Sequence, residues 1–338
     1  MNYNEVLQTA RTKIGTKCKA CPVCNGVACR NTMPGPGAKG VGDTAIRNYQ
    51  KWQEIRVNMD TLCASRPVST ELKLFGKQFK YPFFAGPVGA VAMHYSDAYS
   101  DVAYNEVLVA ACAANGIAAF TGDGLDAGVM TAATQAIAAS QGLGIPTVKP
   151  WNLATIEEKM DLVHQAGAFA VAMDIDAAGL PFLQNMQPPA GSKSVAELRE
   201  IVKLAGVPFI VKGVMTVQAA LKAQEAGAQA IIVSNHGGRV LDQCAATAEV
   251  LPEIAAAVGE KMKIFVDGGI RSGVDIFKAL ALGADAVVIA RPFVTAVFGG
   301  GQEGVQVYIE KLAAELTDTM KMCGAFTLNE ITAAMVRR

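Results

Sequence analysis

The chain has 338 residues, of which 51% are hydrophobic and 18% charged, and its 30 basic and 30 acidic side chains give a formal net charge of +0. This length fits a single large α/β barrel with an ample core. The balanced charge argues against a nucleic-acid binder, which normally carries a basic stripe, and no apolar run reaches the roughly 18 residues of a membrane span. The first residues lack the layout of a secretory signal, so we expect a soluble, cytoplasmic protein.

Residues 1–40 differ in composition from the rest of the chain. They are rich in Cys, Gly, Pro and Lys, and they end in a looping connector over residues 33–40 that has no helical or strand period. We therefore expect a coil-like, Cys-rich segment over 1–40, followed by a barrel over 41–338. Residues 43–58 have mixed helical and extended character, with Trp52 and Ile55 as expected core anchors.

From Tyr81 onward, short apolar runs alternate with alanine-rich amphipathic stretches. The runs predict strands over Tyr81–Gly86, Gly116–Thr121, Ile145–Lys149, Ala168–Asp174, Pro208–Gly213, Ala228–Ser234, Lys261–Asp267 and Asp285–Ala290. The stretches predict helices over Ala103–Ala114, Leu153–His164, Val195–Leu204, Val217–Glu225, Ala246–Ala257, Val274–Leu282 and, last, Glu303–Leu316. Two of these helices are expected to be capped, at Thr155 and at Ser194.

Eight strands alternating with helices predict a (β/α)8 TIM barrel, because parallel strands need crossover helices. The alternative, an open doubly wound sheet, would need a phosphate-binding turn after its first strand, and residues 86–90 match one poorly. In a barrel, the loops after all strands meet at one face. That face would gather the polar or glycine residues found at or just past the strand ends: Asp174, Lys212, Ser234, His236, Arg239, Asp267, Gly268, Gly269 and Arg291.

The stretch Ile231–Asp242 is the most informative of these strand ends, since an apolar run stops there at a polar, glycine-rich turn. His236 can exchange a proton near neutral pH, and Arg239 can bind a carboxylate through two parallel hydrogen bonds. A tight turn with one structural histidine and one surface arginine is the alternative interpretation.

Two further features indicate an anionic ligand. Lys212 ends a buried strand, so it needs an anionic or electron-rich partner; it is either a Schiff-base nucleophile, a cation facing a cofactor, or a solvated rim lysine. The loops after the last two strands contain Gly268 and Gly269 together with Arg271 and Arg291. These loops are the usual phosphate site of a TIM barrel, although a plain helix-entry turn would also use glycines.

Three motifs carry a family resemblance: Ser234-Asn-His-Gly-Gly-Arg-x-Leu-Asp242, the strand-end Lys212-Gly213, and Asp267-Gly-Gly-Ile-Arg-x-Gly with its continuation to Ala284. From about Gly40 to the C-terminus, the chain resembles the FMN-dependent α-hydroxy-acid oxidases and dehydrogenases, the family of glycolate oxidase and lactate oxidase. The motifs are long and specific. The resemblance implies oxidation of a 2-hydroxy acid to a 2-oxo acid, an electron-acceptor protein as a further partner, and a homo-oligomer, commonly a tetramer.

The resemblance also implies a role for each matched residue. His236 would take a proton from the substrate, Asp174 would stabilise its imidazolium, Arg239 would bind the substrate carboxylate, and Lys212 would stabilise reduced flavin. The residues implied to contact FMN are Pro87, Val88, Gly89, Gly122, Thr147, Lys212, Ser234, Asp267, Gly268, Gly269, Arg271, Ala290 and Arg291.

The chain departs from the family pattern around the substrate. Residues 177–181 contain no arginine where the family has one, and Pro34–Gly37 contains no tyrosine. Lys149 stands in the place of a second tyrosine, and Thr147 stands in the place of a glutamine. We therefore expect retained flavin binding and a rebuilt substrate pocket in which Lys149 supplies charge.

Cys18, Cys21, Cys24 and Cys29 form a cluster that is not part of the family pattern. Without an export signal, disulfides are not expected. Thiolates at this spacing can hold an iron–sulfur cluster or a structural zinc ion, and four free thiols are the third interpretation.

Two rival functions remain open from the sequence. One is a flavin-dependent isomerase resembling the type 2 isopentenyl diphosphate isomerases, which the His236–Arg239 pair argues against. The other is an electron-transfer module that combines flavin with an iron–sulfur cluster at the cysteines. His94 and His164 are expected to have structural roles, and Met130 and Met173 are expected in the core.

Overall fold

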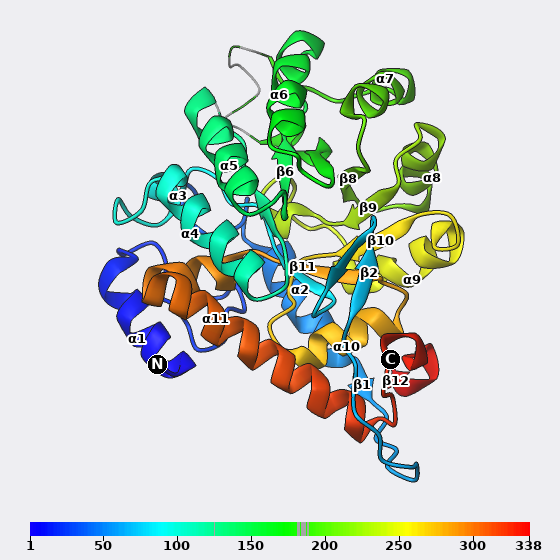
Figure 1. Ribbon diagram of the computed structural model, residues 1–338. Helices are drawn as coiled ribbons and strands as arrows, with labels where there is room; N and C mark the ends of the chain where they lie inside the picture. The colour runs from blue at the N-terminus through cyan, green and yellow to red at the C-terminus, as the bar shows by residue number, and fades with distance from the viewer. Residues whose placement is uncertain (125, 181–182, 184–186, 188) are drawn as a thin grey trace.

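Eight parallel strands close into a barrel in the order β10-β11-β4-β5-β6-β7-β8-β9. Figure 1 shows the computed structural model, with the helices around the strands. The structure describes residues 1–124, 126–180, 183, 187 and 189–338. The barrel strands are β4 (Phe83–Ala85), β5 (Ala119–Thr121), β6 (Gly144–Val148), β7 (Val171–Asp174), β8 (Phe209–Val214), β9 (Ala230–Val233), β10 (Lys263–Val266) and β11 (Ala286–Ile289). Each falls within or overlaps one of the eight predicted runs, so the predicted (β/α)8 barrel is confirmed.

Helices follow the strands and form the outer ring. They are α4 (Asp101–Ala114), α5 (Ala127–Ala139), α6 (Leu153–Gln165), α7 (Val195–Ala205), α8 (Val217–Glu225), α9 (Thr247–Val258), α10 (Gly273–Ala281) and α11 (Arg291–Met322), with the short α3 (Val91–His94) before α4. Helix α5 was not predicted, because its run of alanine and threonine shows no clear polar face. Helix α11 continues past the break at Gly301, so the predicted last helix is only its second part.

The predicted helix caps have different outcomes. Ser194 caps α7, accepting from the Glu197 N–H while the Glu197 side chain returns a bond to the Ser194 N–H. The predicted cap at Thr155 is wrong, because Asn152 starts α6 and accepts from the Thr155 N–H. The cap therefore lies three residues earlier than predicted, and Thr155 lies within the first turn of the helix.

The N-terminal segment is not a simple coil. Helix α1 (Tyr3–Lys13) packs along α11, and α2 (Asp43–Glu54) follows the cysteine-containing loop. Asn2 caps α1 in a reciprocal capping box with Glu5. The expectation of a coil therefore fails for residues 3–13, where a good cap and an apolar face toward α11 favour a helix.

Short elements complete the chain. A hairpin of β2 (Leu72–Leu74) and β3 (Lys77–Phe79) precedes the barrel. The pair β1 (Arg56–Val57) and β12 (Val336–Arg337) joins the beginning of the barrel region to the C-terminus, after the single turns η3 (Leu328–Glu330) and η4 (Ala333–Met335).

The interior of the barrel is filled by every second residue of its strands. One core cluster takes Phe84, Phe120 and Phe265 together with smaller residues from the other strands, and the three rings meet edge to face at 5.8–6.4 Å between centroids. Phe79 from the hairpin adds a fourth ring, 4.9 Å from Phe84. The alternate residues face outward and pack with the helices in a second cluster.

This alternation decides which residues reach the open end of the barrel. The position two residues beyond each inward core residue is again inward. Those positions are Gly86, Gly122, Thr147, Asp174, Lys212, Ser234, Asp267 and Ala290. Three of them are Gly or Ala and five are polar. The open end of the barrel is therefore lined by small apolar residues on one side and by polar or charged side chains on the other.

Helix α2 covers one edge of this open end. The side chains of Asn48 and Asn235 exchange two hydrogen bonds of 2.7 and 2.9 Å. Asn48 Oδ1 also accepts from the Thr247 N–H, and the Trp52 indole donates to the Gly268 carbonyl at 2.8 Å. A side chain at Gly269 would collide with the Asn48 backbone, at 2.3 Å. Helix α2 therefore fixes the loops after β9 and β10.

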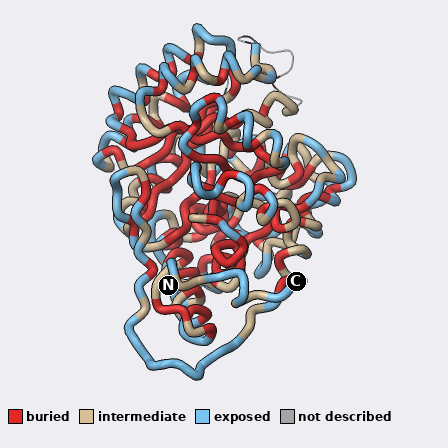
Figure 2. The backbone as a smooth tube through the Cα atoms, turned by 90° about the vertical axis from the view of Figure 1, so that its right-hand side faces the viewer, coloured by how far each residue is buried: buried red, intermediate tan, exposed pale blue. Residues whose placement is uncertain are grey.

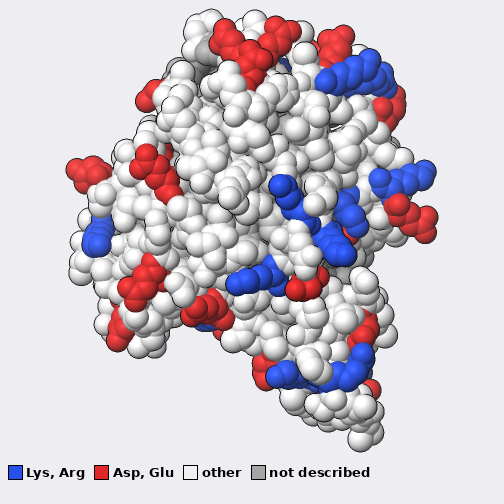
Figure 3. All heavy atoms as spheres, viewed as in Figure 1, with Lys and Arg blue, Asp and Glu red and all other residues white. Residues whose placement is uncertain are grey.

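The surface is unremarkable in charge. Buried residues are concentrated in the strands and the inner helix faces (Figure 2). Acidic and basic side chains are both scattered over the face shown in Figure 3, without a basic stripe. Among the described helices, none combines the length and apolar character needed to cross a membrane.

We expect Asn48→Ala to destabilise the protein by on the order of 2–3 kcal/mol, because it leaves the buried Asn235 amide and the Thr247 N–H without their partner. Urea denaturation followed by circular dichroism measures the change. Asn58→Ala, on the exposed side of the chain, is the matched control. Equal stability of the two variants would show that α2 is not held by this contact.

Candidate active site

A cleft of about 250 Å³ opens at the carboxyl ends of the barrel strands. Its walls come from the loops after seven of the eight strands and from the N-terminal segment. The lining includes nearly all of the residues that the sequence predicts: Pro87, Val88, Gly89, Gly122, Thr147, Lys149, Asp174, Lys212, His236, Arg239, Asp267, Gly268, Arg271, Ala290 and Arg291. The strand-end alternation therefore brings residues separated by up to about two hundred positions to one place. Ser234 lies beneath, fully buried.

Asp174 is the centre of a buried ion network. Lys212 Nζ donates to its Oδ1 at 2.8 Å, and Lys149 Nζ donates to its Oδ2 at 2.5 Å. The β7–β8 register pairs Asp174 directly with Lys212, which is why both reach the cleft from the same level. Burial alone would raise the pKa of Asp174, but the charges of His236, Lys149 and Lys212 hold it well below its ordinary value.

Lys212 is charged despite its burial. Desolvation would lower its pKa, but the carboxylates of Asp174, Asp176 and Asp267 outweigh burial and raise the pKa above its ordinary value. This positive charge argues against the Schiff-base interpretation, which needs a neutral amine at physiological pH.

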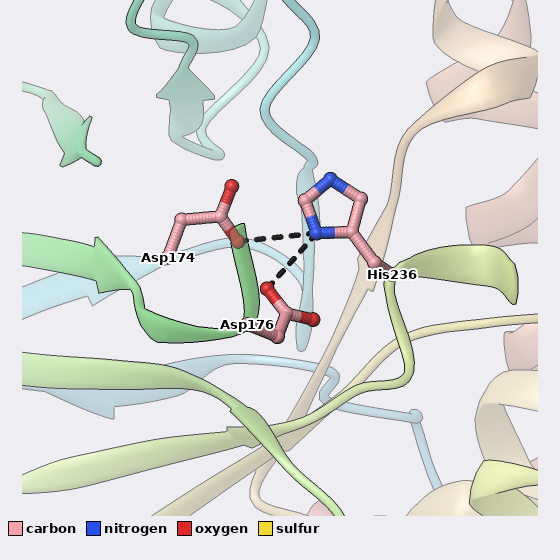
Figure 4. Close-up of side chains that lie close together, drawn as sticks. All are labelled: Asp174, Asp176 and His236. Atoms are coloured by element: carbon pink, nitrogen blue, oxygen red, sulfur yellow. Dashed lines mark hydrogen bonds and ion pairs between the residues drawn. The ribbon is translucent and has the colours of Figure 1, made fainter. Parts of the chain in front are cut away.

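His236 follows β9 in the single turn η2 (His236–Gly238) and adopts φ +55°, a left-handed conformation that is rare outside glycine. Its Nδ1 lies 2.9 Å from Asp176 Oδ1 and 3.4 Å from Asp174 Oδ1 (Figure 4). The family resemblance implies Asp174 as the partner of His236, whereas the nearer carboxylate is that of Asp176. The sequence does show this second acidic residue two positions past the strand end, and it could have indicated the partner.

A bulge in β8 makes room for Asp176. The strand register shifts between Lys212 and Val214, and Gly213 at the bulge has φ +104°. A side chain at Gly213 would place its Cβ 2.6 Å from the Cβ of Asp176. Glycine is therefore required for Asp176, in the turn η1 (Ile175–Gly179), to reach His236.

These three side chains do not form a metal site. In the described part of the chain, Asp174, Asp176 and His236 are the one set of His, Cys, Asp or Glu side chains with three ligand atoms within 4.8 Å of one another. Both oxygens of Asp174 already accept from lysine ammonium groups, and Lys212 lies 3.9 Å from Asp176. A metal cation would have to displace these lysines.

Arg239 is held against the N-terminal segment. Its Nη1 donates to the carbonyls of Gly35 and Gly37 at 2.7 and 2.8 Å, in the stretch where the family resemblance leads one to expect a tyrosine. Burial, with the nearby charge of Arg291, lowers the pKa of Arg239 to about 10. Only the Nε and Nη2 side of the guanidinium remains for a ligand.

His94, expected outside the site, lines the cleft beside Arg239. Its Nδ1 accepts from the Gly35 N–H at 3.0 Å, and its Nε2 lies 3.1 Å from Arg239 Nη2. Burial and the charges of Arg239 and Lys17 lower the pKa of His94 to about 4, so the ring is neutral at pH 7. A histidine nine residues past the end of β4 carries no sequence signal that would place it in the cleft. The other such histidine, His164, contacts the Ala205 carbonyl away from the cleft.

Two arginines stand at the other end of the cleft. Arg291 Nη2 donates to the Gly237 carbonyl at 2.9 Å, and Arg271 Nε donates to the Cys24 carbonyl at 2.6 Å. Gly268 and Gly269 precede Arg271 with φ of +81° and +85°. Ser234 donates to Asp267 Oδ2, while Asp267 Oδ1 and Thr147 Oγ1 are buried without a hydrogen-bond partner. Unpartnered buried oxygens facing a cleft are sites for a ligand.

The family model described as FMN-dependent dehydrogenase matches residues 36–187 and 182–338. The chain belongs to this family. The cysteine cluster precedes the matched residues. A peroxisomal (S)-2-hydroxyacid oxidase of Arabidopsis thaliana is 46% identical over 145 residues, which are 43% of this chain and 39% of the relative. An L-lactate oxidase of Lactobacillus jensenii is 40% identical over 163 residues, 48% of this chain and 40% of the relative.

These matches span about two fifths of those curated relatives. A longer alignment exists with 4-hydroxymandelate oxidase of Amycolatopsis orientalis, 29% identical over 350 residues and covering 88% of this chain and 92% of the relative. Among solved structures, a mandelate oxidase variant with (S)-mandelic acid has a TM-score of 0.80 at 24% identity, covering 99% of this chain and 97% of the other. A flavocytochrome b2 variant with pyruvate has a TM-score of 0.76 at 23% identity, covering 87% and 78%. These structures share the fold.

We expect the depressed pKa of His94 to make the protein less stable in acid. The pKa is about 4 in the folded state against 6.5 for the free side chain, so the unfolded chain binds the extra proton between these values. Stability should therefore fall as the pH drops from about 6.5 to about 4, by roughly 2–3 kcal/mol from this group.

Urea denaturation at pH 7 and at pH 4.5 measures this loss. His94→Gln should lose less stability between the two pH values than the unsubstituted protein, whereas His164→Gln should behave like the unsubstituted protein. The same loss in all three proteins would contradict the assignment.

Proposed function

We propose that the chain oxidises a 2-hydroxy acid to the 2-oxo acid with FMN as the bound oxidant. The observation that carries the proposal is the cleft itself, in which His236 lies against two carboxylates and Arg239 lines the same space, while two further arginines lie at the far end. A base next to a carboxylate-binding cation is what removal of a proton from a 2-hydroxy acid requires. Family membership supports the same reaction.

The residues of the cleft fit FMN. Arg271 and Arg291 offer two cations for its phosphate, beside the glycines that open the loop after β10. Thr147 Oγ1 and Asp267 Oδ1 are unpartnered and suit the polar edge of the ring and the ribityl hydroxyls. Gly86, Gly122 and Ala290 carry no large side chain, so they leave room for a flat ring at the open end of the barrel. Bound FMN would supply the two-electron acceptor for the substrate.

The tautomer of His236 suits a base. The Asp176 carboxylate accepts at 2.9 Å from Nδ1, so the neutral ring carries its proton there and leaves the Nε2 lone pair to take a proton from the substrate. Figure 4 shows Nε2 turned away from both carboxylates. When Nε2 is protonated, Asp176 and Asp174 stabilise the imidazolium that forms.

Arg239 and His94 suit the substrate carboxylate. Because His94 Nδ1 accepts from Gly35, its neutral ring carries the proton on Nε2. Two donors, Nε2–H of His94 and Nη2–H of Arg239, then lie 3.1 Å apart. An anionic oxygen within reach of both would stabilise this arrangement. Lys149, in the place of a family tyrosine, adds a second cation beside Arg239 to the lining of the cleft.

The charge of Lys212 suits the reduced, negatively charged state of the flavin. Its ammonium is fixed by Asp174 and stays charged, so it would balance the negative charge of reduced flavin without itself transferring a proton. Asp174 thus has three partners to orient: Lys149, Lys212 and His236.

The proposal is tested by adding glycolate, lactate and mandelate in turn to the FMN-loaded protein under anaerobic conditions and following flavin absorbance. At least one acid should bleach the flavin. His236→Ala should slow that reaction by about 10²–10⁴-fold, because the proton then has no acceptor, while His164→Ala should not change it. Failure of a wide panel of 2-hydroxy acids to reduce the flavin would refute the proposal.

Asp176→Asn should lower the maximal rate of flavin reduction by about 10- to 100-fold, less than loss of the base, because Asp174 still lies 3.4 Å from His236 Nδ1. The substrate dissociation constant should change little, since Asp176 acts through His236. Stopped-flow reduction at several substrate concentrations separates the two quantities. Asp285→Asn, on the outside of the barrel, is the control, and a pure affinity loss in Asp176→Asn would count against the assigned role.

A further inference from the structure

The four clustered cysteines line one cavity of about 250 Å³ next to the cleft. We call it the cysteine cavity. It is lined by the four thiols of Cys18, Cys21, Cys24 and Cys29, by the basic side chains of Lys19, Arg271, Arg291 and Lys311, by the acidic Asp275 and by uncharged neighbours. All four thiols are partly buried and none is in a disulfide. From this convergence we propose that the cysteine cavity binds a [4Fe–4S] cluster through these four thiolates.

The loop that carries the cysteines is built into the barrel. The Cys24 carbonyl accepts from Arg271 Nε at 2.6 Å, and a side chain at Gly26, which has φ +84°, would meet Ala45 of α2 at 3.3 Å. Ala20, between the first two cysteines, adopts φ +40° and directs its N–H to Cys18 Sγ at 3.5 Å. A non-glycine residue in this conformation indicates a constrained turn, and an N–H directed at sulfur is typical of a ligating thiolate.

The sulfurs are spaced too widely to surround a single zinc ion. Four thiolates around one zinc ion at about 2.3 Å lie roughly 3.8 Å from one another. No three of these four sulfurs lie within 4.8 Å of one another, since the described residues hold no such set of cysteines. In a [4Fe–4S] cluster each thiolate binds a different iron, so the sulfurs stand farther apart around a central volume. The cysteine cavity supplies that volume.

The charge of the cavity also suits a cluster. Four thiolates around a [4Fe–4S] core give a net negative group, and four basic side chains line the same cavity. A bound cluster would therefore place its negative charge among these basic side chains.

The spacing Cys-x2-Cys-x2-Cys-x4-Cys differs by one residue from the run found in bacterial ferredoxins, whose last cysteine serves a second cluster. Here the fourth residue, Cys29, lines the same cavity as the other three. The extra residue is consistent with a fourth ligand that returns to the same cluster. The site lies outside the residues matched by the family, so it is a property of this chain.

The test is metal and sulfide analysis of the full-length protein, produced and purified without oxygen. We expect about four iron atoms and four acid-labile sulfides per chain, and an electron paramagnetic resonance signal after reduction with dithionite. One zinc ion per chain without sulfide would overturn the proposal, as would protein without metal that also fails to take up ferrous iron and sulfide on reconstitution.

Cys21→Ser and Cys24→Ser should each lower the iron content several-fold, whereas Cys63→Ser, which changes an exposed cysteine outside the cavity, should not. Circular dichroism and FMN content are measured for every variant, so that loss of iron in a folded, flavin-containing protein is separated from misfolding. Retention of the full iron content in both variants would overturn the assignment. The iron content does not depend on any 2-hydroxy acid, so this proposal and the proposed function fail independently.

Discussion

In a closed barrel, every strand residue faces either the interior or the surrounding helices, and the whole site depends on this constraint. Phe84, Phe120 and Phe265 fill the interior at one level, together with the smaller residues of the other strands. The next inward position along each strand lies at the open end of the barrel. Core side chains cannot cover it, because the core ends one level below. It is therefore where the chain can place groups that need a ligand or an ionic partner. Small residues on one side and charged ones on the other make this position a binding surface.

The charges at this level stabilise one another. Asp174 accepts from two lysines and lies near His236, so removing any one partner would leave a buried charge without compensation. The same network keeps Lys212 charged and places the Asp176 carboxylate beside His236 Nδ1. The arrangement of charges in the cleft is thus a result of the way in which the barrel balances buried charge.

Most of the architecture could be predicted because the strands are apolar runs with clear ends. Lys212, Asp174 and Asp267 were predictable for the same reason, since a polar residue that ends such a run has to face the open end of the barrel. Helix α5 was missed because alanine and threonine give no amphipathic contrast. Asp176 and His94 were missed because their positions depend on the bulge at Gly213 and on the path of residues 33–40, which are tertiary features without a local pattern.

The polypeptide between Cys29 and Arg239's carbonyl partners is short. Thr32 bonds back to Cys29, Gly37 bonds back to Thr32, and the oxygens of Gly35 and Gly37 hold the guanidinium. The backbone that holds Arg239 at the cleft is therefore a direct extension of the loop that carries the cysteines. Oxidation of the cysteines would therefore disturb the backbone that holds the Arg239 guanidinium, and damage to the loop would be felt in the cleft without any change to the residues of the barrel.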